Sequence, residues 1–193
     1  MNRTVVILVV ALTVALGSII SVRAEEREVV INEVAWGGTK ASPFDEWIEL
    51  RNNTQCLIDF TGWRLTSDDG IPAIKLTGII PAKGFYLLER TDDHTISDIQ
   101  ADQVYAGALS NSGERLELLD RQGNIVDTAN GDGGSWPAGA GKPLYISMER
   151  VDPGGGDTFG NWKSNNLKTR NGLDAEGNLI NGTPGEENST RIF

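Results

Sequence analysis

Cysteine and histidine are almost absent from this chain of 193 residues. Cys56 is its only cysteine, so no disulfide can form within the chain. The neighbours of Cys56 in "CLIDF" are apolar, which predicts a buried, unreactive thiol. His94 is the only histidine and lies in the polar stretch "RTDDHTISD", which predicts an exposed loop. Metal sites and catalytic sites that need two histidines are therefore excluded.

Runs of lysine and arginine are also missing. Without Arg3 and Arg23, which lie in the first 24 residues, the chain carries 15 basic and 27 acidic side chains, a net charge of −12. A polyanion such as DNA would be repelled unless a local basic face exists. This balance argues against nucleic acid as a partner and leaves divalent cations, neutral glycans and proteins open.

Long apolar runs are confined to the N-terminus. Arg3 precedes an apolar stretch from Val5 to Ile20, and small residues follow at the two positions that signal peptidase reads, Val22 and Ala24. The pattern predicts a secretory signal peptide at residues 1–24 and a secreted, extracellular or cell-surface protein. The alternative is an uncleaved anchor, although the run is shorter than the roughly 20 residues that span a bilayer comfortably.

Helical periodicity is not found after the signal peptide. Short runs rich in Val, Ile, Leu, Trp and Tyr alternate with Gly, Asp, Asn and Pro, as in antiparallel β-proteins. Eight runs predict strands, and this number in one domain indicates a sandwich or a barrel. The predicted strands are Glu28–Trp36, Glu46–Asn52, Gly62–Thr66, Ala73–Thr77, Gly84–Glu89, Arg115–Leu119, Asn124–Thr128 and Leu144–Val151.

Residues 25–189 are predicted to form one domain, followed by a short tail at 190–193. The strongest local prediction is a hairpin between Arg115 and Thr128, whose turn contains Gly123, a residue that tolerates positive φ. Five tryptophans are spread over the whole chain, which favours one common core over one binding groove. The C-terminal third is rich in Gly, Asn and Asp, and we expect ordered loops up to about Trp162 and looser structure after it.

Acidic residues occur within the first two predicted strands. Alternation places Glu33 on the face of Ile31, and Glu46 on the face of Ile48 and Leu50. A carboxylate on such a core-directed face must be paired or hydrogen-bonded. We therefore expect Glu33 and Glu46 to be structural acids held by arginines, while Glu49 faces outward. The candidate partners in or beside strands are Arg51, Arg64, Arg90, Arg115 and Arg150.

The same stretch is also the candidate binding site, made by Glu33, Glu46, Trp47 and Glu49. Two acids close together could instead act as a glycosidase-like pair or hold a metal or ligand. A second candidate is a calcium-like loop in "DTANGDGG", with oxygen ligands from Asp127, Asn130 and Asp132. Its spacing does not follow an EF-hand loop, and a polar turn without Ca²⁺ is the competing interpretation.

The order of several motifs resembles the lamin-tail domain in its bacterial and archaeal secreted form. From Val29 to Asn188 these motifs are "INEVAW", "DEWIEL", "IDFTGWRL", "PAKGFYLLER", "ADQVYAGALSNSGERLELLDRQGNIVD", "SMERVD" and "GTPGEEN". The resemblance implies an immunoglobulin-like antiparallel β-sandwich with long Gly/Asn/Asp-rich C-terminal loops. It also implies a non-enzymatic interaction module, and it supplies no catalytic residues. The chain lacks the coiled-coil rod of lamins, which puts filament assembly in doubt.

The sequence therefore predicts an exported, non-enzymatic binding or adhesion module with a protein or glycan partner. Two alternatives remain open at this point. One is a metal-dependent hydrolase, or a domain stabilised by Ca²⁺, that uses the acidic loops. The other is a nucleic-acid-associated module, which would need a basic face.

Overall fold

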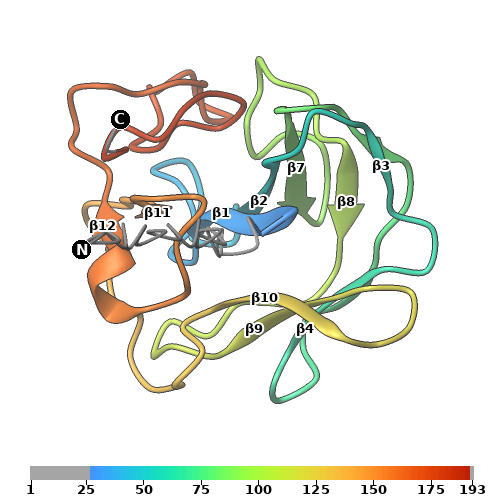
Figure 1. Ribbon diagram of the computed structural model, residues 1–193. Helices are drawn as coiled ribbons and strands as arrows, with labels where there is room; N and C mark the ends of the chain where they lie inside the picture. The colour runs from blue at the N-terminus through green and yellow to red at the C-terminus, as the bar shows by residue number, and fades with distance from the viewer. Residues whose placement is uncertain (1–26, 192–193) are drawn as a thin grey trace, which may run out of the picture.

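The computed structural model describes residues 27–191, so the predicted signal peptide lies outside the described residues. These residues form two sheets that pack face to face, as Figure 1 shows, with a small third sheet beside them. The predicted immunoglobulin-like β-sandwich is confirmed. No helix within residues 27–191 is both long and apolar enough to cross a bilayer.

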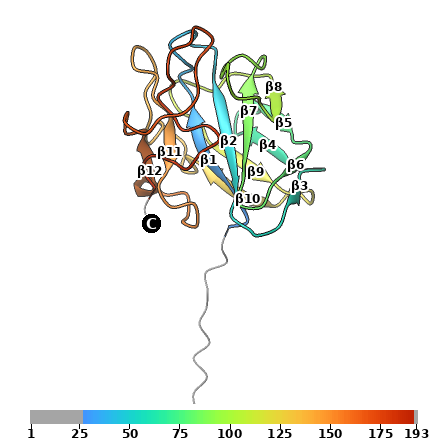
Figure 2. The same cartoon turned by 90° about the horizontal axis from the view of Figure 1, so that it is seen from above.

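The larger sheet has six strands in the order β12-β11-β1-β2-β7-β8. Neighbouring strands are antiparallel, except for the parallel pair β7 and β8. Figure 2 shows this sheet with β12 and β11 on one side and β7 and β8 on the other. Its strands are β1 (Val29–Ala35), β2 (Trp47–Asn52), β7 (Phe85–Arg90), β8 (Gln103–Tyr105), β11 (Met148–Arg150) and β12 (Trp162–Ser164).

The smaller sheets complete the sandwich. The four-stranded sheet has the order β10-β9-β4-β5, with β10 (Ile125–Ala129), β9 (Leu116–Leu119), β4 (Arg64–Ser67) and β5 (Ala73–Lys75). A two-stranded sheet pairs β3 (Ile58–Asp59) with β6 (Ile79–Ile80). One 3₁₀ turn, η1 (Phe159–Asn161), precedes β12.

Alternating apolar residues form the core between the two main sheets. Ile48 and Leu50 of β2 face Leu65 of β4 and Leu116 and Leu118 of β9 within one buried cluster. All eight predicted strands overlap observed ones, but β3, β6, β8 and β12 were not predicted. These four are two or three residues long, too short to show a period of two.

The hairpin of β9 and β10 has the predicted turn. The backbone of Gly123 has a φ of 83°, and the Asp120 carboxylate accepts hydrogen bonds from the backbone N–H groups of Gln122 and Asn124. Four tryptophans pack in or against the main core, as predicted, but Trp47 belongs to a second, smaller cluster. The thiol prediction was wrong, because Cys56 is exposed in the loop before β3.

The expectation of looser structure after Trp162 was also wrong. Residues 165–190, called the C-terminal cover below, lie on the face of the six-stranded sheet that points away from the four-stranded sheet (Figure 1, red, at the top). Asn165, Asp174, Thr183 and Asn188 of this cover are buried. Glycine and asparagine in it therefore mark ordered turns rather than a solvated tail.

A buried ion pair joins the two sheets. The Arg150 guanidinium on β11 donates to the Asp127 carboxylate on β10 at 2.5 Å, and both side chains are fully buried. Asp127 also accepts from the backbone N–H of Ile31 on β1 at 2.9 Å, and Arg150 donates to the Ile31 carbonyl at 2.8 Å. The Arg150 guanidinium lies 4.6 Å from the ring centre of Trp162. Every charge in this connection therefore has a partner.

Replacing Asp127 with alanine leaves Arg150 buried without its carboxylate. We expect Asp127→Ala to lower the free energy of unfolding by about 3–5 kcal/mol, measured by urea denaturation. The control is Glu117→Ala, which removes a partly exposed ion pair with Arg115 and should cost less than about 1 kcal/mol. An equal fall in the free energy of unfolding in the two variants would contradict the larger contribution expected of the buried ion pair.

Candidate functional site

Three glutamates form a row across the six-stranded sheet. Glu33 on β1 is paired in register with Glu49 on β2 and with Glu149 on β11. All three side chains are fully buried, and each accepts a hydrogen bond from the C-terminal cover. We call Glu33, Glu49 and Glu149 the carboxylate row.

A β-bulge puts Glu33 into this row. The pairing of β1 with β2 shifts by one residue between Ile31 and Glu33, so Ile31 and Val34 both reach the main core. Glu33 and Ala35 consequently take the opposite face. The predicted placement of Glu33 on the same face as Ile31 was wrong, because a bulge reverses the alternation of side chains beyond it.

The C-terminal cover supplies hydrogen-bond donors to Glu33. The Thr183 backbone N–H donates to this carboxylate at 3.0 Å, and the Thr183 hydroxyl donates at 2.9 Å. A third donor is the Ser147 hydroxyl at 2.5 Å, just before β11. The predicted arginine partner for Glu33 is therefore wrong: hydroxyl and amide groups hold this carboxylate.

The cover holds the other two carboxylates in the same way. Glu149 accepts hydrogen bonds from the Asn165 side chain at 2.6 Å, the Ser189 hydroxyl at 2.8 Å and the Thr190 backbone N–H at 3.1 Å. Glu49 accepts from the Gly185 backbone N–H at 2.5 Å and from Asn32 at 2.8 Å. The outward direction predicted for Glu49 is correct, but the cover buries it.

Close packing and one more ion pair fix the "GTPGEEN" segment in place. A Cβ atom on Gly182 would lie 2.7 Å from Cζ2 of Trp47 and 2.9 Å from Oε1 of Glu33, so only glycine fits there. Glu187 accepts two hydrogen bonds from the Arg51 guanidinium, each 2.7 Å long. The Asn188 side chain donates to the backbone carbonyl oxygens of Asn32 and Arg150.

Burial changes the acidity of the row. Desolvation raises the pKa of Glu49 to about 8, although hydrogen bonds from Gly185 and Asn32 oppose the shift. Desolvation also raises the pKa of Glu33 well above its ordinary value, and the neighbouring charges of Glu149 and Glu49 add to the effect. Part of the row is therefore protonated near neutral pH.

Glu46, the remaining predicted site acid, lies apart from the row. It accepts a hydrogen bond from the Leu109 backbone N–H at 2.7 Å and pairs with Arg90 at 3.2 Å. The arginine partner predicted for Glu46 is therefore confirmed, whereas the one predicted for Glu33 is not. Desolvation raises the pKa of Glu46 to about 7, while Leu109 and Arg90 lower it.

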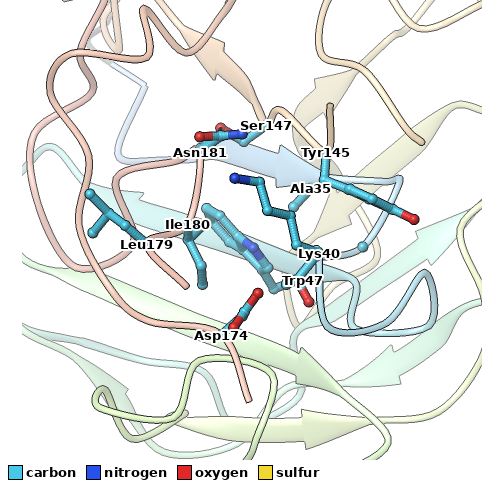
Figure 3. Close-up of a pocket in the computed structure, with 11 residues that line it drawn as sticks. Ala35, Lys40, Trp47, Tyr145, Ser147, Asp174, Leu179, Ile180 and Asn181 are labelled. Atoms are coloured by element: carbon cyan, nitrogen blue, oxygen red, sulfur yellow. Dashed lines mark hydrogen bonds between the residues drawn. The ribbon is translucent and has the colours of Figure 1, made fainter. Parts of the chain in front are cut away.

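Trp47 lines a small cavity between the sheet and the cover. Figure 3 shows its ring among Lys40, Asp174, Ile180 and Ser147. The cavity volume is about 10 Å³, which is room for at most one water molecule. The Trp47 indole N–H has no hydrogen-bond partner among the described residues. A site of this size does not admit a sugar or a peptide side chain.

The loop predicted to resemble a calcium site is only partly assembled. Asp127 lies in the ion pair with Arg150, and Arg27 donates to its second oxygen at 3.1 Å. Desolvation raises the pKa of Asp127 to about 6, against the effect of the two arginines. The structure therefore uses Asp127 within the sandwich.

The other two residues of that loop line a hollow of about 160 Å³ together with Asp157. The Asn130 side chain donates to two backbone carbonyls, and the Asp157 carboxylate accepts from Thr128, Gly131 and Trp162. Asp132 is exposed. Across residues 27–191 no group of three or more His, Cys, Asp or Glu side chains is placed to hold a metal ion.

Sequence reasoning missed Glu149 and the cover. In "SMERVD", alternation would place Met148 inward and Glu149 on the opposite face, beside Glu33. Nothing in this local pattern indicates that residues 165–190 return to bury that face. The available signal was the "GTPGEEN" motif, whose glycines and threonine suit close approach and hydrogen bonding to a buried carboxylate.

Gly182→Ala tests the fit of the cover. The added methyl group would overlap Trp47 and Glu33, so we expect the free energy of unfolding to fall by about 1–3 kcal/mol in urea denaturation. Gly160→Ala is the control, because a Cβ atom there meets no atom within 4 Å. A stability of Gly182→Ala equal to that of wild type would show that the cover is loosely seated.

The pH dependence of stability tests the carboxylate row. The folded-state pKa of Glu49, about 8, lies above its ordinary value, so its stabilising contribution is complete at acid pH and is lost as the pH rises through 8. We expect the free energy of unfolding to fall between pH 6 and pH 8, an interval that lies between the ordinary pKa of 4.5 and the folded-state pKa. Glu49→Gln, which cannot titrate, should reduce this fall by about 1–3 kcal/mol.

The matched control is Glu176→Gln, a substitution of an exposed glutamate in the same cover. It should leave the pH dependence unchanged. If the free energy of unfolding changes with pH equally in wild type and Glu49→Gln, Glu49 does not titrate in this pH range.

The comparison with known proteins agrees with this architecture. The family model of the Lamin Tail Domain matches residues 23–131, a range that contains Glu33 and Glu49 but not Glu149 or the cover. No curated protein matches the sequence. Because the matched range is more than half of the 193 residues, the chain belongs to the lamin tail domain family.

Proposed function

We propose that this protein is an exported, non-catalytic module that binds a partner at the cell surface or outside the cell. Its family consists of immunoglobulin-like structural domains and is not an enzyme family. The sequence pattern of residues 1–24 supports export. The proposal therefore combines a binding module, which the family indicates, with a location and a partner that experiments must establish.

The observation that carries the proposal is the use of the acidic residues inside the fold. Glu33 and Glu49, two acids of the candidate binding site, are both fully buried and hydrogen-bonded to the chain itself. A glycosidase-like pair needs space for a sugar between its carboxyl groups. Here Thr183 and Gly185 of the cover occupy that place. A structural role for these acids supports a function in binding rather than in catalysis.

The outer surface of the sandwich leaves room for such a partner. A hollow of about 530 Å³ lies at the ends of β4 and β5, within the range of about 300–1,000 Å³ that is common for ligand sites. It is much larger than the cavity at Trp47. The module therefore offers one side for binding while the cover occupies the other.

Affinity capture tests this function. Immobilised protein starting at Glu25 is incubated with the extracellular and envelope fractions of the host, and separately with its cytosol. We expect a protein or glycan to be retained from the first two fractions. The same preparation is incubated with purified cell-wall polymers, and chain length is followed to detect turnover.

The variant Asp127→Ala, if unfolded at the assay temperature, is the control for non-specific retention. Specific capture is absent in that control. Cleavage of a polymer by the wild-type protein, or capture from the cytosol alone, would contradict a non-catalytic module that works outside the cell.

A further inference from the structure

The outer face of the four-stranded sheet carries a row of cationic and apolar side chains. Arg64 on β4 is paired in register with Lys75 on β5 and with Leu119 on β9. Leu119 is in turn paired with Ile125 on β10. Arg64 and Lys75 are exposed, Leu119 is half-buried and Ile125 is 52% exposed. Two positive charges are thus followed by two apolar side chains across four strands.

The cationic end of this row borders the hollow of about 530 Å³. Arg64 and Lys75 line it together with Arg121, which lies in the turn between β9 and β10. Trp63 and Leu76 also contribute to the lining, and both are almost completely buried. We call this hollow the cationic groove.

The cations of the groove have no acidic partner at ion-pair distance among residues 27–191. In the part of the chain that the structure describes, Arg64, Lys75 and Arg121 form no ion pair. The nearby Asp59 is bound to its own turn, where the Thr61 backbone N–H and hydroxyl donate to it. These hydrogen bonds lower the pKa of Asp59, and Arg121 adds a smaller effect.

The second acid near the groove is Asp120, and its carboxylate caps the β9–β10 turn. Both neighbouring acids therefore already have local donors. Arg64, Lys75 and Arg121 thus gather three exposed cations, without an ion-pair partner in the described part of the chain, around one hollow of a chain whose net charge is −10. Charge complementarity points to an anionic ligand.

The side chains around the cations distinguish a peptide from a glycan. Sugar sites commonly present an aromatic ring for stacking, but Trp63 is only 7% exposed. Leu119 and Ile125 instead offer an aliphatic surface next to the charges, which suits apolar side chains of a protein. Arginine binds a carboxylate with two parallel hydrogen bonds and is enriched in protein interfaces.

We propose that Arg64, Lys75 and Arg121, together with Leu119 and Ile125, form a docking site for an acidic peptide segment of a partner protein. Carboxylates of the segment bind in the cationic groove, and its apolar residues lie on Leu119 and Ile125. This assignment rests on the proposed binding function and adds the chemical class of the partner.

The test uses a soluble, end-blocked peptide of alternating glutamate and leucine, labelled with fluorescein. Anisotropy titration of the protein starting at Glu25 should give saturable binding with a Kd below about 1 mM, a value typical of weak peptide contacts. Binding should weaken as salt increases, because exposed charges are screened. The double variant Arg64→Glu/Lys75→Glu should weaken binding at least about tenfold.

The matched control is Lys168→Glu, a charge reversal at an exposed lysine in the C-terminal cover, and it should leave the affinity unchanged. Thermal melts establish that each variant is folded. Ile125→Ser, which keeps all charges, should weaken binding of the glutamate–leucine peptide more than binding of a polyglutamate peptide. This difference between the two peptides would show that Ile125 contacts the apolar side chains of the bound peptide.

Several results would overturn the docking site. The first is the absence of saturation at millimolar peptide, and the second is an equal affinity of the double variant and the wild type for the peptide. The third is binding of polygalacturonate or of a single-stranded oligodeoxythymidylate in place of the peptide. The capture experiment separates this proposal from the function on which it rests. If the double variant still retains the captured partner, the docking site is wrong while the binding function stands.

Discussion

Burial of negative charge is the constraint on which the architecture depends. A carboxylate removed from water is stable only with hydrogen-bond donors or a proton. Strand pairing in the six-stranded sheet places Glu33, Glu49 and Glu149 in register. Without the C-terminal cover, the sheet would expose three neighbouring acids that repel one another. The C-terminal cover resolves this by bringing hydroxyl and amide donors to each of them. The strands and the cover are therefore one cooperative structure.

The two faces of the sandwich differ in how they satisfy polar groups. On the covered face, the carboxyl groups are stabilised within the chain, by hydrogen bonds from Thr183 and Gly185 and by the raised pKa of Glu49, which favours its neutral form. On the opposite outer face, Arg64 and Lys75 remain exposed. Exposed positive charge is thus present on the face that the C-terminal cover does not reach. The covered face satisfies its polar groups within the chain, while the uncovered face leaves these cations to the solvent.

Local patterns predicted most of the sandwich but little of the covered face. Alternation placed Ile48 and Leu50 in the core correctly, because β2 is regular. It failed at Glu33, because the bulge after Ile31 inserts one residue, and a period of two does not reveal such an insertion. Alternation could not predict the burial of Glu49, because its hydrogen-bond donor Gly185 lies 136 residues away in sequence. Contacts of that range depend on topology, and no single-strand pattern encodes them.

The position of the cover at the end of the described chain affects the order of folding. Residues 27–164 contain every strand of both main sheets, and they leave the ribosome before residues 165–190. Until residues 165–190 emerge, the carboxylate row remains hydrated, and the six-stranded sheet lacks the C-terminal cover. Completion of the domain therefore waits for the synthesis of residues 165–190. The face that carries the carboxylate row is consequently the last part of the described domain to be covered during synthesis.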